Sequence, residues 1–525
     1  MKAASLIKKA AGYLGGMGIR GTAYKLRLRL RTDAMQKKAR VVPHTQADID
    51  AQRKNAQDLG TVLVLADATG MDGAAIARTI GSLTAQTYPF WRLCIVNADA
   101  PLDNHADGRV FAPQHPCGDA AYIALLAPNC TLHPCALYDA VQQLAVHGAD
   151  AAYTDEIDEN GNGLFKPDDS PRLLQGMGYL GGFIAAKQAL LKEVQENLSA
   201  FAFSGEAAHR LMLEMAGRAK RIAHVPQALC VRHAPLAVHR AAHESAAGRV
   251  KDAGLVSILI PNKDHAQDLL RCVNSLRAKT TYPDWEIVII ENNSTEPETF
   301  ACYEELKKDP RIRVAVWETG FNYAAINNFG ETFARGRYLL LLNNDVEIIT
   351  PEWLEEMLLY AQEEKVGAVG AMLYYPDDTV QHAGVIVGVG DVAGHAFRGA
   401  KRGEGGYMDL LFAAREVSAV TAACLLMRRD VYREIGGMDE GYAVAYNDVD
   451  MCMRIRQAGY DIVFTPHAEL YHYESVSRGL DTTAEKYMRY YGEATRFHRR
   501  WRAQLEQGDP YHNGNLSKRR EDFGV

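Results

Sequence analysis

Polar and acidic side chains follow several apolar runs of this sequence, at the point where each run ends. The stretch "YLLLLNNDVEIITPEW", residues 338–353, passes from four leucines into two asparagines and Asp345. Asp264 follows "ILIP" closely, and Glu291 closes "IVII". Carboxylates gathered in one place repel one another unless a proton or a cation shares the site. Mg²⁺ or Mn²⁺ would suit such a site, because both take oxygen ligands from one or two carboxylates and from substrate phosphates.

A further pair of acids opens a predicted helix in "YNDVDMCMRIRQAG", residues 446–459. Asp448 and Asp450 lie at its start, and Gly459 can end it. Taken singly, each of these polar groups is also an ordinary turn residue or helix N-cap. The functional interpretation therefore depends on the groups meeting at one place.

The elements around these residues alternate between strand and helix. Apolar, β-branched runs predict strands over 256–261, 285–291 and 338–342, and amphipathic patterns predict helices over 266–279 and 322–334. This alternation is typical of a parallel sheet covered by helices on both faces. Ligands of such sheets bind beyond the carboxyl ends of the strands, where the acids of the second copy described below would meet.

The chain repeats itself. "SLTAQTYPFWRLCIVNADA" begins at Ser82 and "SLRAKTTYPDWEIVIIENNS" begins at Ser275, with their Tyr-Pro-x-Trp cores 194 positions apart. "IALLAPNCTLHP" and "RIAHVPQALCVRH" are echoed later, in the same order, by "YLLLLNNDVEIITP" and "DIVFTPHAELYH". We therefore predict a tandem duplication. The expected domains are a basic segment over 1–55, a first copy over 56–250, a second copy over 251–480 and a helical tail over 481–525.

Composition limits the class of protein. The 525 residues are 47% apolar and 23% charged, as in a globular protein of two or three domains. No apolar run is long enough to cross a bilayer, and the N-terminus lacks the apolar core of a signal peptide. The nine cysteines are scattered without a CxxC pair, which favours a reducing cytoplasm over a disulfide framework.

The net charge of −7 is unevenly spread. Residues 1–40 hold eleven Lys or Arg against one acid, and "YKLRLRLR" within them alternates as an amphipathic edge strand would. Such an arm predicts peripheral contact with anionic lipid on the inner face of the cell membrane, with a solvated basic tail as the alternative. We expect no nucleic-acid partner.

The second copy resembles the inverting family-two glycosyltransferases of the GT-A fold, above all bacterial rhamnosyltransferases of surface-polysaccharide (O-antigen or capsule) synthesis. The resemblance runs from about Val256 to Arg478 and rests on motifs in a fixed order. These are "SILIPNKD", "IVIIENNS", "FNYAAINN", "LLLLNNDVEI", "QHAGVIVGVGDVAGHAFRG", "TAACLLMRRDVYREIGGMDE", "YNDVDMCMRIRQAGY" and "YHYESVSRG". The fold class that it implies is α/β, with two tandem GT-A domains of which the first is degenerate.

The resemblance also implies roles for individual residues. Asp345 matches the metal-binding Asp of the DxD motif, His472 the histidine that closes the metal and diphosphate site, and Asp448 the catalytic base, with Asp450 as its rival. One departure is Asn343, an amide at the first acidic position of that motif, which adds no charge. The residues expected to bind the nucleotide-sugar donor are Pro261, Asp264, Glu291, Asn293, Asn322, Asn327, Asn343 and Asn344. His382 and His395 would face the sugars, or would be structural histidines.

These assignments predict one displacement, with inversion at the anomeric carbon. A cation at Asp345 would stabilise the departing nucleotide diphosphate, and Asp448 would take the proton of the acceptor hydroxyl. The expected donor is a dTDP- or UDP-sugar, and the expected acceptor is a glycan, taken to be lipid-linked. A metal-dependent hexosyl or rhamnosyl transferase is therefore the predicted enzyme.

The first copy lacks several of the residues expected to bind the metal and the donor in the second copy. By alignment Asn129 stands opposite Asp345, Asn97 opposite Glu291, Glu206 opposite Asp448 and His233 opposite His472. The acidic stretch "YTDEIDENGNGLFKPDDSP" could hold a cation or be a solvated turn. Two rival functions stay open. One is a catalytically silent glycan-binding scaffold. The other is a nucleotidyltransferase, although "PNKDHAQD" lacks the Gly-rich loop expected of one.

Overall fold

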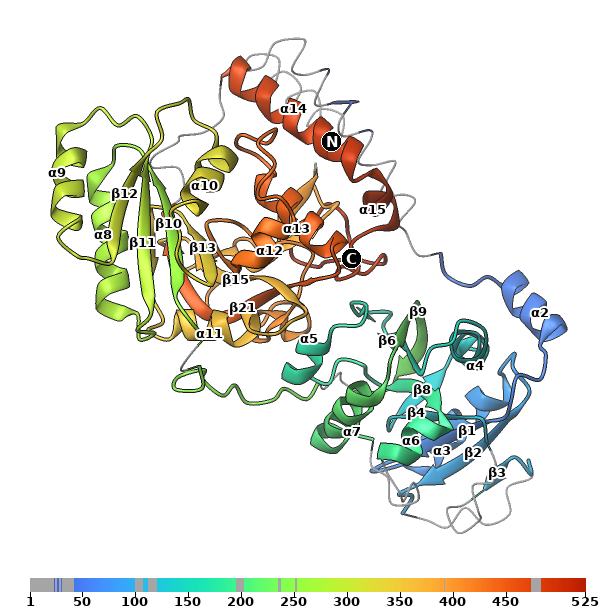
Figure 1. Cartoon of the computed structure of the whole chain (residues 1–525). Helices are drawn as coiled ribbons and strands as arrows, with labels where there is room; N and C mark the ends of the chain where they lie inside the picture. The colour runs from blue at the N-terminus through green and yellow to red at the C-terminus, as the bar shows by residue number, and fades with distance from the viewer. Residues whose placement is uncertain are drawn as a thin grey trace. The chain divides into compact units, whose positions relative to one another are not determined.

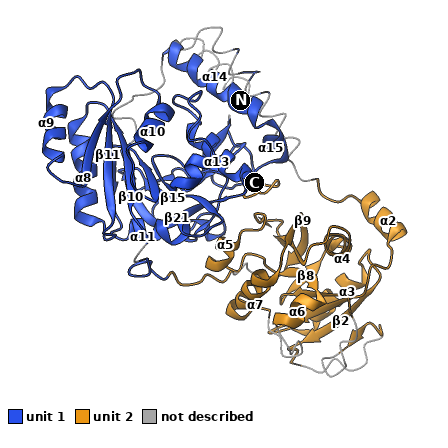
Figure 2. Ribbon diagram, viewed as in Figure 1, with its two compact units in different colours: residues 1–39, 244–509, 517–525 blue, residues 40–243, 510–516 orange. Residues whose placement is uncertain are grey.

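A computed structural model describes residues 42–99, 107–111, 120–194, 203–234, 238–250, 253–390, 392–473 and 483–525, with isolated positions between 23 and 30. The chain forms two compact units (Figure 2). The N-terminal unit comprises residues 40–243 and 510–516, and the C-terminal unit comprises residues 1–39, 244–509 and 517–525. The chain thus returns to the N-terminal unit for seven residues near its end.

The C-terminal unit is built on a ten-stranded sheet with the strand order β12-β11-β10-β13-β20-β15-β21-β14, to which β16 and β19 add at β15 and β21 (Figure 1). Its strands are β10 Val256–Asn262, β11 Trp285–Glu291, β12 Ile312–Val316, β13 Tyr338–Leu342, β14 Val346–Ile348, β15 Val366–Tyr374, β16 Val380–His382, β19 Arg415–Glu416, β20 Cys424–Arg428 and β21 Asp461–His472. A separate hairpin joins β17 Val385–Val387 to β18 Ala393–His395.

Helices cover both faces of this sheet. They are α8 Ala266–Lys279, α9 Pro297–Leu306, α10 Tyr323–Glu331, α11 Trp353–Ala361, α12 Arg429–Glu434, α13 Asn447–Gln457, α14 Ala484–Arg500 and α15 Arg502–Gln507, with a 3₁₀ turn at Tyr407–Phe412. Leu269 of α8 and Trp353 of α11 pack with Ile258 and Leu340 in one core cluster. On the other face, a Cβ at Gly330 of α10 would lie 2.9 Å from Ile290, so the missing side chain lets that helix approach the sheet.

The N-terminal unit repeats the eight-strand path of that sheet in the order β3-β2-β1-β4-β8-β6-β9-β5, with β7 on β6 as β16 is on β15, and the described residues hold no counterpart of β19. Its strands are β1 Val62–Asp67, β2 Trp91–Val96, β3 Val110–Phe111, β4 Tyr122–Leu126, β5 Cys130–Leu132, β6 Ala151–Asp158, β7 Gly163–Leu164, β8 Phe183–Lys187 and β9 Ile222–Arg232. Its helices are α2 Gln46–Asn55, α3 Gly73–Thr84, α4 Ala136–Val141, α5 Pro171–Gly176, α6 Gln188–Val194 and α7 Gly205–Arg218, with a π-turn at Gln142–Val146. The predicted α/β class and tandem duplication are confirmed.

The repeated Tyr-Pro-x-Trp motif has a structural explanation. The hydroxyl of buried Tyr282 donates to Gly254 O at 2.9 Å, and that of Tyr88 donates to Gly60 O at 2.7 Å, so each ring ties down the segment before the first strand. The tryptophan that follows carries an arginine over its ring in both units, with Arg311 over Trp285 and Arg109 over Trp91. The repeated Tyr-Pro-x-Trp motif therefore stabilises the fold of each unit and takes no part in the functional site.

Three expectations need correction. Each sheet is mixed instead of parallel, because β20 runs antiparallel to β13 and β15, and β8 does the same in the N-terminal unit. The helix predicted over 322–334 ends at Glu331. In the basic segment, the described positions Ala23, Leu26, Arg27 and Leu30 are helical and exposed, so no edge strand forms at those positions. The rest of residues 1–41 lies outside the described part of the chain.

In the ranges that the structure describes, no helix is both long and apolar enough to span a membrane.

Candidate functional site

The strand ends of the C-terminal unit bring Asp345 and His472 together. Asp345 lies in the turn between β13 and β14, and the pairing of Val346 with His472 places the last residue of β21 beside it. His472 Nε2 lies 3.2 Å from Asp345 Oδ1, and the side chains are only 9% and 6% exposed. Among the described residues Oδ1 of Asp345 accepts no hydrogen bond, although it is buried. An unpaired buried carboxylate oxygen is costly and needs a partner.

The contacts of Gln381, on β16, indicate which nitrogen of the His472 ring carries the proton. The Nε2 amide of Gln381 donates to the His472 carbonyl at 3.2 Å, so its Oε1 is the atom that faces His472 Nδ1 at 2.6 Å. An amide oxygen only accepts, so the proton of a neutral His472 imidazole sits on Nδ1. The Nε2 atom is left with its lone pair toward Asp345 Oδ1 and toward Asn343 Nδ2 at 3.1 Å.

Two electron-rich atoms thus face each other in a buried corner. This donor set fits a divalent cation, which takes an imidazole nitrogen and a carboxylate oxygen and gains from an orienting partner behind the imidazole. In the described ranges, no group of three or more His, Cys, Asp or Glu side chains is arranged so that it could hold a metal ion by itself. The remaining ligands would have to come from substrate and water.

Asp448 is the second residue of α13, a helix that begins directly after Tyr446, whose backbone is left-handed. Its Oδ2 accepts from the Ala422 N–H at 3.1 Å, and it is partly exposed. Tyr323 of α10 joins this carboxylate to the Asp345 corner, because its hydroxyl donates to Ala422 O at 3.1 Å and lies 3.5 Å from Asn343 Oδ1. Burial, and then the charge of Asp448, raise the pKa of Tyr323, so its hydroxyl stays neutral.

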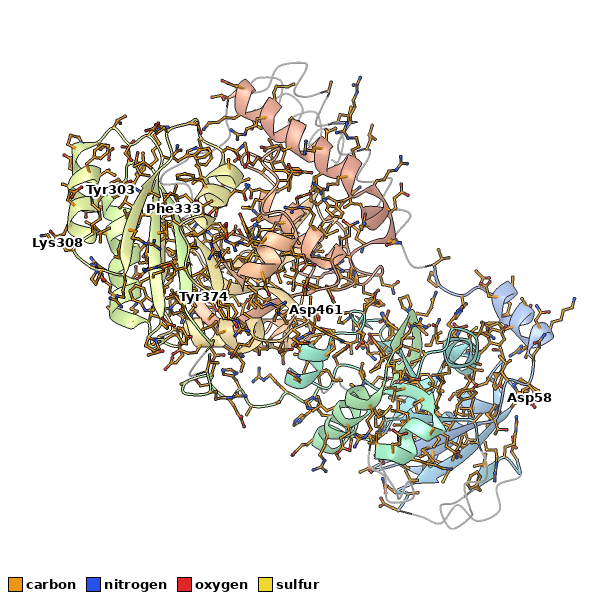
Figure 3. All side chains as sticks on the ribbon, viewed as in Figure 1. Asp58, Tyr303, Lys308, Phe333, Tyr374 and Asp461 are labelled. Carbon is orange, nitrogen blue, oxygen red and sulfur yellow. The ribbon has the colours of Figure 1, made fainter. Side chains whose placement is uncertain are left out.

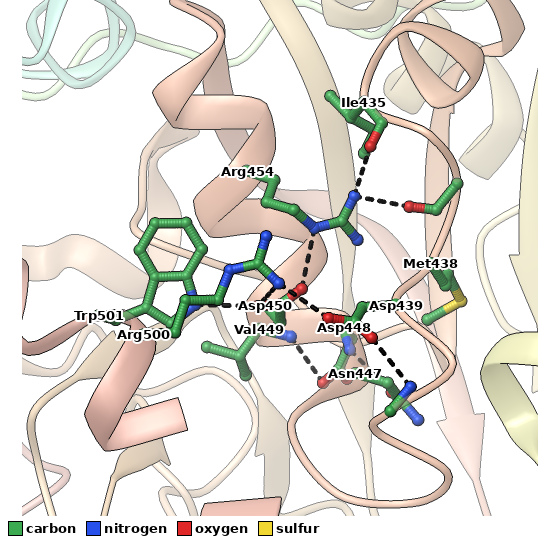
Figure 4. A network of polar contacts seen from close by, with 12 residues as sticks. Ile435, Met438, Asp439, Asn447, Asp448, Val449, Asp450, Arg454, Arg500 and Trp501 are labelled. Carbon is green, nitrogen blue, oxygen red and sulfur yellow. Dashed lines mark hydrogen bonds and ion pairs between the residues drawn. The ribbon is translucent and has the colours of Figure 1, made fainter. Parts of the chain in front are cut away.

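Asp450 is placed quite differently (Figure 4). It is fully buried, its Oδ1 accepts from Trp501 Nε1 at 2.9 Å, and its Oδ2 accepts from Arg454 Nε at 2.9 Å. Arg500 lies 3.3 Å from Oδ1 as well. Asp450 therefore holds α13 to the helices at the C-terminal end of the chain and does not face an acceptor, which leaves Asp448 as the candidate base.

The residues expected to bind the nucleotide base and ribose form hydrogen bonds that hold the loops after β10 and β11 in place. Asp264 Oδ1 accepts the backbone N–H groups of Thr295 at 2.6 Å and Glu296 at 3.0 Å. Burial would raise the pKa of Asp264, but these two donors hold it below its usual value. Both carboxylate oxygens of Glu291 accept from Ser294 at 2.6 Å.

Tyr303 of α9, labelled in Figure 3, also donates to Glu291, at 2.9 Å. The adjacent Pro261 is half-buried on β10, and Asn293, exposed at a left-handed turn, donates to Thr319 O at 2.7 Å. The four expected donor residues at this end of the sheet thus lie on neighbouring strand ends.

The other asparagines divide between half-buried and buried positions. Asn322 caps α10 by accepting from the Ala325 N–H at 3.1 Å. Asn344 donates to Asn262 at 2.6 Å and ties the Asp345 turn to β10. Asn327 is wholly buried and donates to Tyr323 O, so it does not line an open diphosphate site as expected.

His382 is a structural histidine in this fold. It is fully buried, its Nε2 accepts from the Gly384 and Thr421 N–H groups, and its Nδ1 lies 2.9 Å from His395 Nδ1. Burial, and then cationic side chains nearby, hold its pKa well below the usual value. His395 is half-buried beside it.

The N-terminal unit has different groups at the same corner. Cys130 of β5 pairs with Arg232 of β9 as Val346 pairs with His472, so Arg232 stands where His472 does. Our alignment of His233 with His472 is therefore wrong by one residue, which in a strand turns the side chain to the opposite face. Asn129 precedes β5 as Asp345 precedes β14. Glu206, exposed, is the second residue of α7, as Asp448 is of α13.

Comparison with known proteins now identifies the C-terminal unit. Residues 257–436 match the family model described as glycosyl transferase family 2. This part of the chain is a family 2 glycosyltransferase domain. The match agrees with the predicted GT-A fold.

Curated relatives extend beyond the family 2 domain. An uncharacterized Sinorhizobium fredii protein, y4gI, is 35% identical over 86% of this chain and 57% of its own length. The O-antigen biosynthesis protein RfbC of Myxococcus xanthus is 34% identical over 77% of this chain and 34% of its own length. The chain thus spans about half or less of these relatives. A solved structure of GalNAc-T7 with UDP, GalNAc and Mn²⁺ covers 51% of this chain and 50% of its own, at 15% identity and TM-score 0.39.

Sequence reasoning missed two residues of the family 2 domain. Gln381 stands next to His382 in the quoted "QHAG" stretch, and Tyr323 stands inside "FNYAAINN". A glutamine at a buried strand position is a signal in itself, since a buried amide needs a partner. Nothing local in the sequence says that this partner is a histidine 91 residues away.

Proposed function

We propose that the C-terminal unit transfers a sugar from a nucleotide-diphosphate donor to a hydroxyl of a growing surface glycan. The family 2 match and the similarity to an O-antigen biosynthesis protein support the reaction class and the setting. The observation that carries the chemistry is the unpaired Asp345 oxygen facing the lone pair of His472. That pair would hold Mg²⁺ or Mn²⁺, which when bound offsets the charge that builds on a departing diphosphate.

The chain's own residues then have separate tasks. Gln381 fixes the His472 tautomer, and Asn343 supplies an amide N–H beside it. Asp264 and Glu291 order the two loops at the end of β10 and β11, where the nucleoside would lie. Asp448 takes the proton of the attacking hydroxyl, and this single base with a single displacement gives inversion.

We propose a nucleotide-diphosphate sugar as the donor and a lipid-linked glycan as the acceptor. A dTDP- or UDP-sugar fits the resemblance, and rhamnosyl transfer is favoured by a Mycobacterium tuberculosis relative, an N-acetylglucosaminyl-diphospho-decaprenol L-rhamnosyltransferase, that is 39% identical over 13% of this chain. That relative's name also supports a lipid-linked acceptor. Attachment to the inner face of the cell membrane through residues 1–40 would bring the unit to such an acceptor.

The test is a donor screen by nucleotide release, with Mg²⁺ and with Mn²⁺, on the full chain and on Asp448→Asn. We expect release from one donor with the wild type and a loss of about 10²–10⁴-fold in Asp448→Asn, with nucleotide binding retained. Full activity in that variant would remove Asp448 from the mechanism. No release from any donor would favour the catalytically silent, glycan-binding alternative.

A further inference from the structure

A pocket of about 480 Å³ lies in the N-terminal unit, between the β6–β7 hairpin and the end of β9. Its volume is within the range of about 300–1,000 Å³ that is usual for small-ligand sites. The polar side chains that line it include Glu156, Asp158, Asn160, Asn162, Arg232 and His233. Through Arg232 it occupies the corner that corresponds to the Asp345–His472 pair of the other unit.

A buried charge cluster forms the floor of the pocket. Glu156 Oε1 accepts from Lys166 Nζ at 2.6 Å, and its Oε2 accepts from Arg232 Nε at 2.9 Å. Lys166 is fully buried and also donates to two carbonyls, those of Thr154 and Leu180. The backbone leaves room for this cluster at Gly181, a residue with φ +87°. A Cβ at that position would lie 1.8 Å from Glu156 Oε1, so any larger residue would displace the carboxylate.

The rim is equally fixed. Asp158 accepts the backbone N–H groups of Asn160 at 2.9 Å and Asn162 at 2.7 Å. The ring of His233 lies between Glu159 Oε1 at 2.6 Å and Thr131 Oγ1 at 2.8 Å. The polar groups of the pocket are therefore held in place before any ligand arrives, which reduces the entropic cost of binding.

The charges argue against a second nucleotide-sugar site. Three carboxylates line the pocket against one guanidinium and the ammonium of Lys166 behind it, so the pocket has no surplus positive charge for a diphosphate. Nor does the corner offer the metal route, because Asn129 and Arg232 stand where Asp345 and His472 stand in the other unit. A guanidinium cannot ligate a cation.

We propose that this pocket binds a neutral sugar residue, so that the N-terminal unit is a carbohydrate-binding unit without transfer chemistry of its own. Sugar hydroxyls both donate and accept, which suits a mixture of amides, carboxylates and a guanidinium with little net charge. Ile157 and Leu164 add apolar surface for the C–H faces of a sugar ring. The inference holds whether or not the C-terminal unit is a transferase.

The experiment is saturation-transfer NMR on the full chain carrying Asp345→Ala, which disables the other unit's metal corner. The probes are the methyl glycosides of L-rhamnose, D-mannose, D-galactose and N-acetyl-D-glucosamine. We expect transfer to at least one of them, lost when Ala234→Trp fills the pocket and kept in Ala219→Trp, a matched substitution at another half-buried alanine of the same unit. Asn160→Ala should weaken binding roughly 2- to 10-fold, as the loss of one hydrogen bond would.

Three results would overturn the proposal. The first is no transfer to any of the four glycosides. The second is transfer that survives both Ala234→Trp and Asn160→Ala. The third is displacement of the glycoside by UDP or dTDP on the Asp345→Ala chain, which would make the pocket a nucleotide site instead. Should Ala234→Trp fail to fold, Asn160→Ala decides, because that side chain is exposed at the hairpin tip.

Discussion

The substitution Asp345→Asn should stabilise the C-terminal unit while abolishing its metal chemistry. The isosteric amide replaces an oxygen that accepts no hydrogen bond in the described structure with a group that can donate one. Its target is the lone pair of a neutral His472 at Nε2, 3.2 Å from the present oxygen, which it would share with the Asn343 amide at 3.1 Å. Repulsion between two electron-rich atoms is thereby exchanged for a hydrogen bond.

The expected gain is about 1 kcal/mol in the free energy of unfolding, the net worth of one buried hydrogen bond, measured without divalent cations. Urea unfolding of the full chain in EDTA can be followed by tryptophan fluorescence. Four of the five tryptophans, Trp285, Trp317, Trp353 and Trp501, belong to the C-terminal unit, so the signal reports mainly that unit. Calorimetry with Mn²⁺ should show that Asp345→Asn no longer binds UDP or dTDP in a metal-dependent way.

A destabilised Asp345→Asn chain would refute this reasoning. It would mean that His472 carries a proton on Nε2 and forms an ion pair with Asp345, so that the amide removes an attraction. The control is Glu347→Gln, which removes a charge two residues further along the chain, on β14, and should stay within about 0.5 kcal/mol of the wild type. A gain of equal size in that control would show a general charge effect instead.

Three further predictions concern stability. Asp450→Asn leaves Arg454 without its buried partner and should cost about 3 kcal/mol or more in urea unfolding; a chain as stable as the wild type would show that the network in Figure 4 contributes nothing. Asn513→Ala removes the amide that donates to buried Asp155 at 2.8 Å and to Lys166 O at 2.9 Å. It should speed hydrogen exchange in the N-terminal unit at a cost of about 1–3 kcal/mol, with unchanged exchange as the contrary result. Burial would raise the pKa of Glu156, but Lys166 and Arg232 lower it from 4.5 to about 2, so stability present above pH 4.5 should be lost as the pH falls toward 2. Glu156→Gln should flatten that dependence, and an unaltered acid transition would argue against it.

The strand-end residues show how far pattern alone reaches. The strands over 285–291 and 338–342 and the helix over 266–279 form as predicted, because an unbroken apolar run or a 3.6-residue period states which face is buried. Once the strands are placed, the groups that follow them must share one edge of the sheet. The convergence of Asp264, Glu291 and Asp345 on that edge was therefore available from the sequence.

The sequence alone settles only part of the choice between Asp448 and Asp450 as the base. Residues two apart on an α-helix point to different sides, so the two carboxylates could not share a role. Which side faces the site depends on Trp501 and Arg454, which occupy one of them. The N-terminal unit shows the same limit of sequence patterns. Strand pairing places Arg232, and not the neighbouring His233, at the corresponding corner.

The sequence by itself determined the doubled α/β architecture and the positions of the acids, since both follow from local periodicity and chain order. Tertiary structure alone decided what those acids can do. The His472 tautomer depends on Gln381, 91 residues away, and the fate of Asp450 depends on Trp501, 51 residues away. Hydrogen-bond direction is a property of groups brought together by folding, and no pattern within either stretch records it.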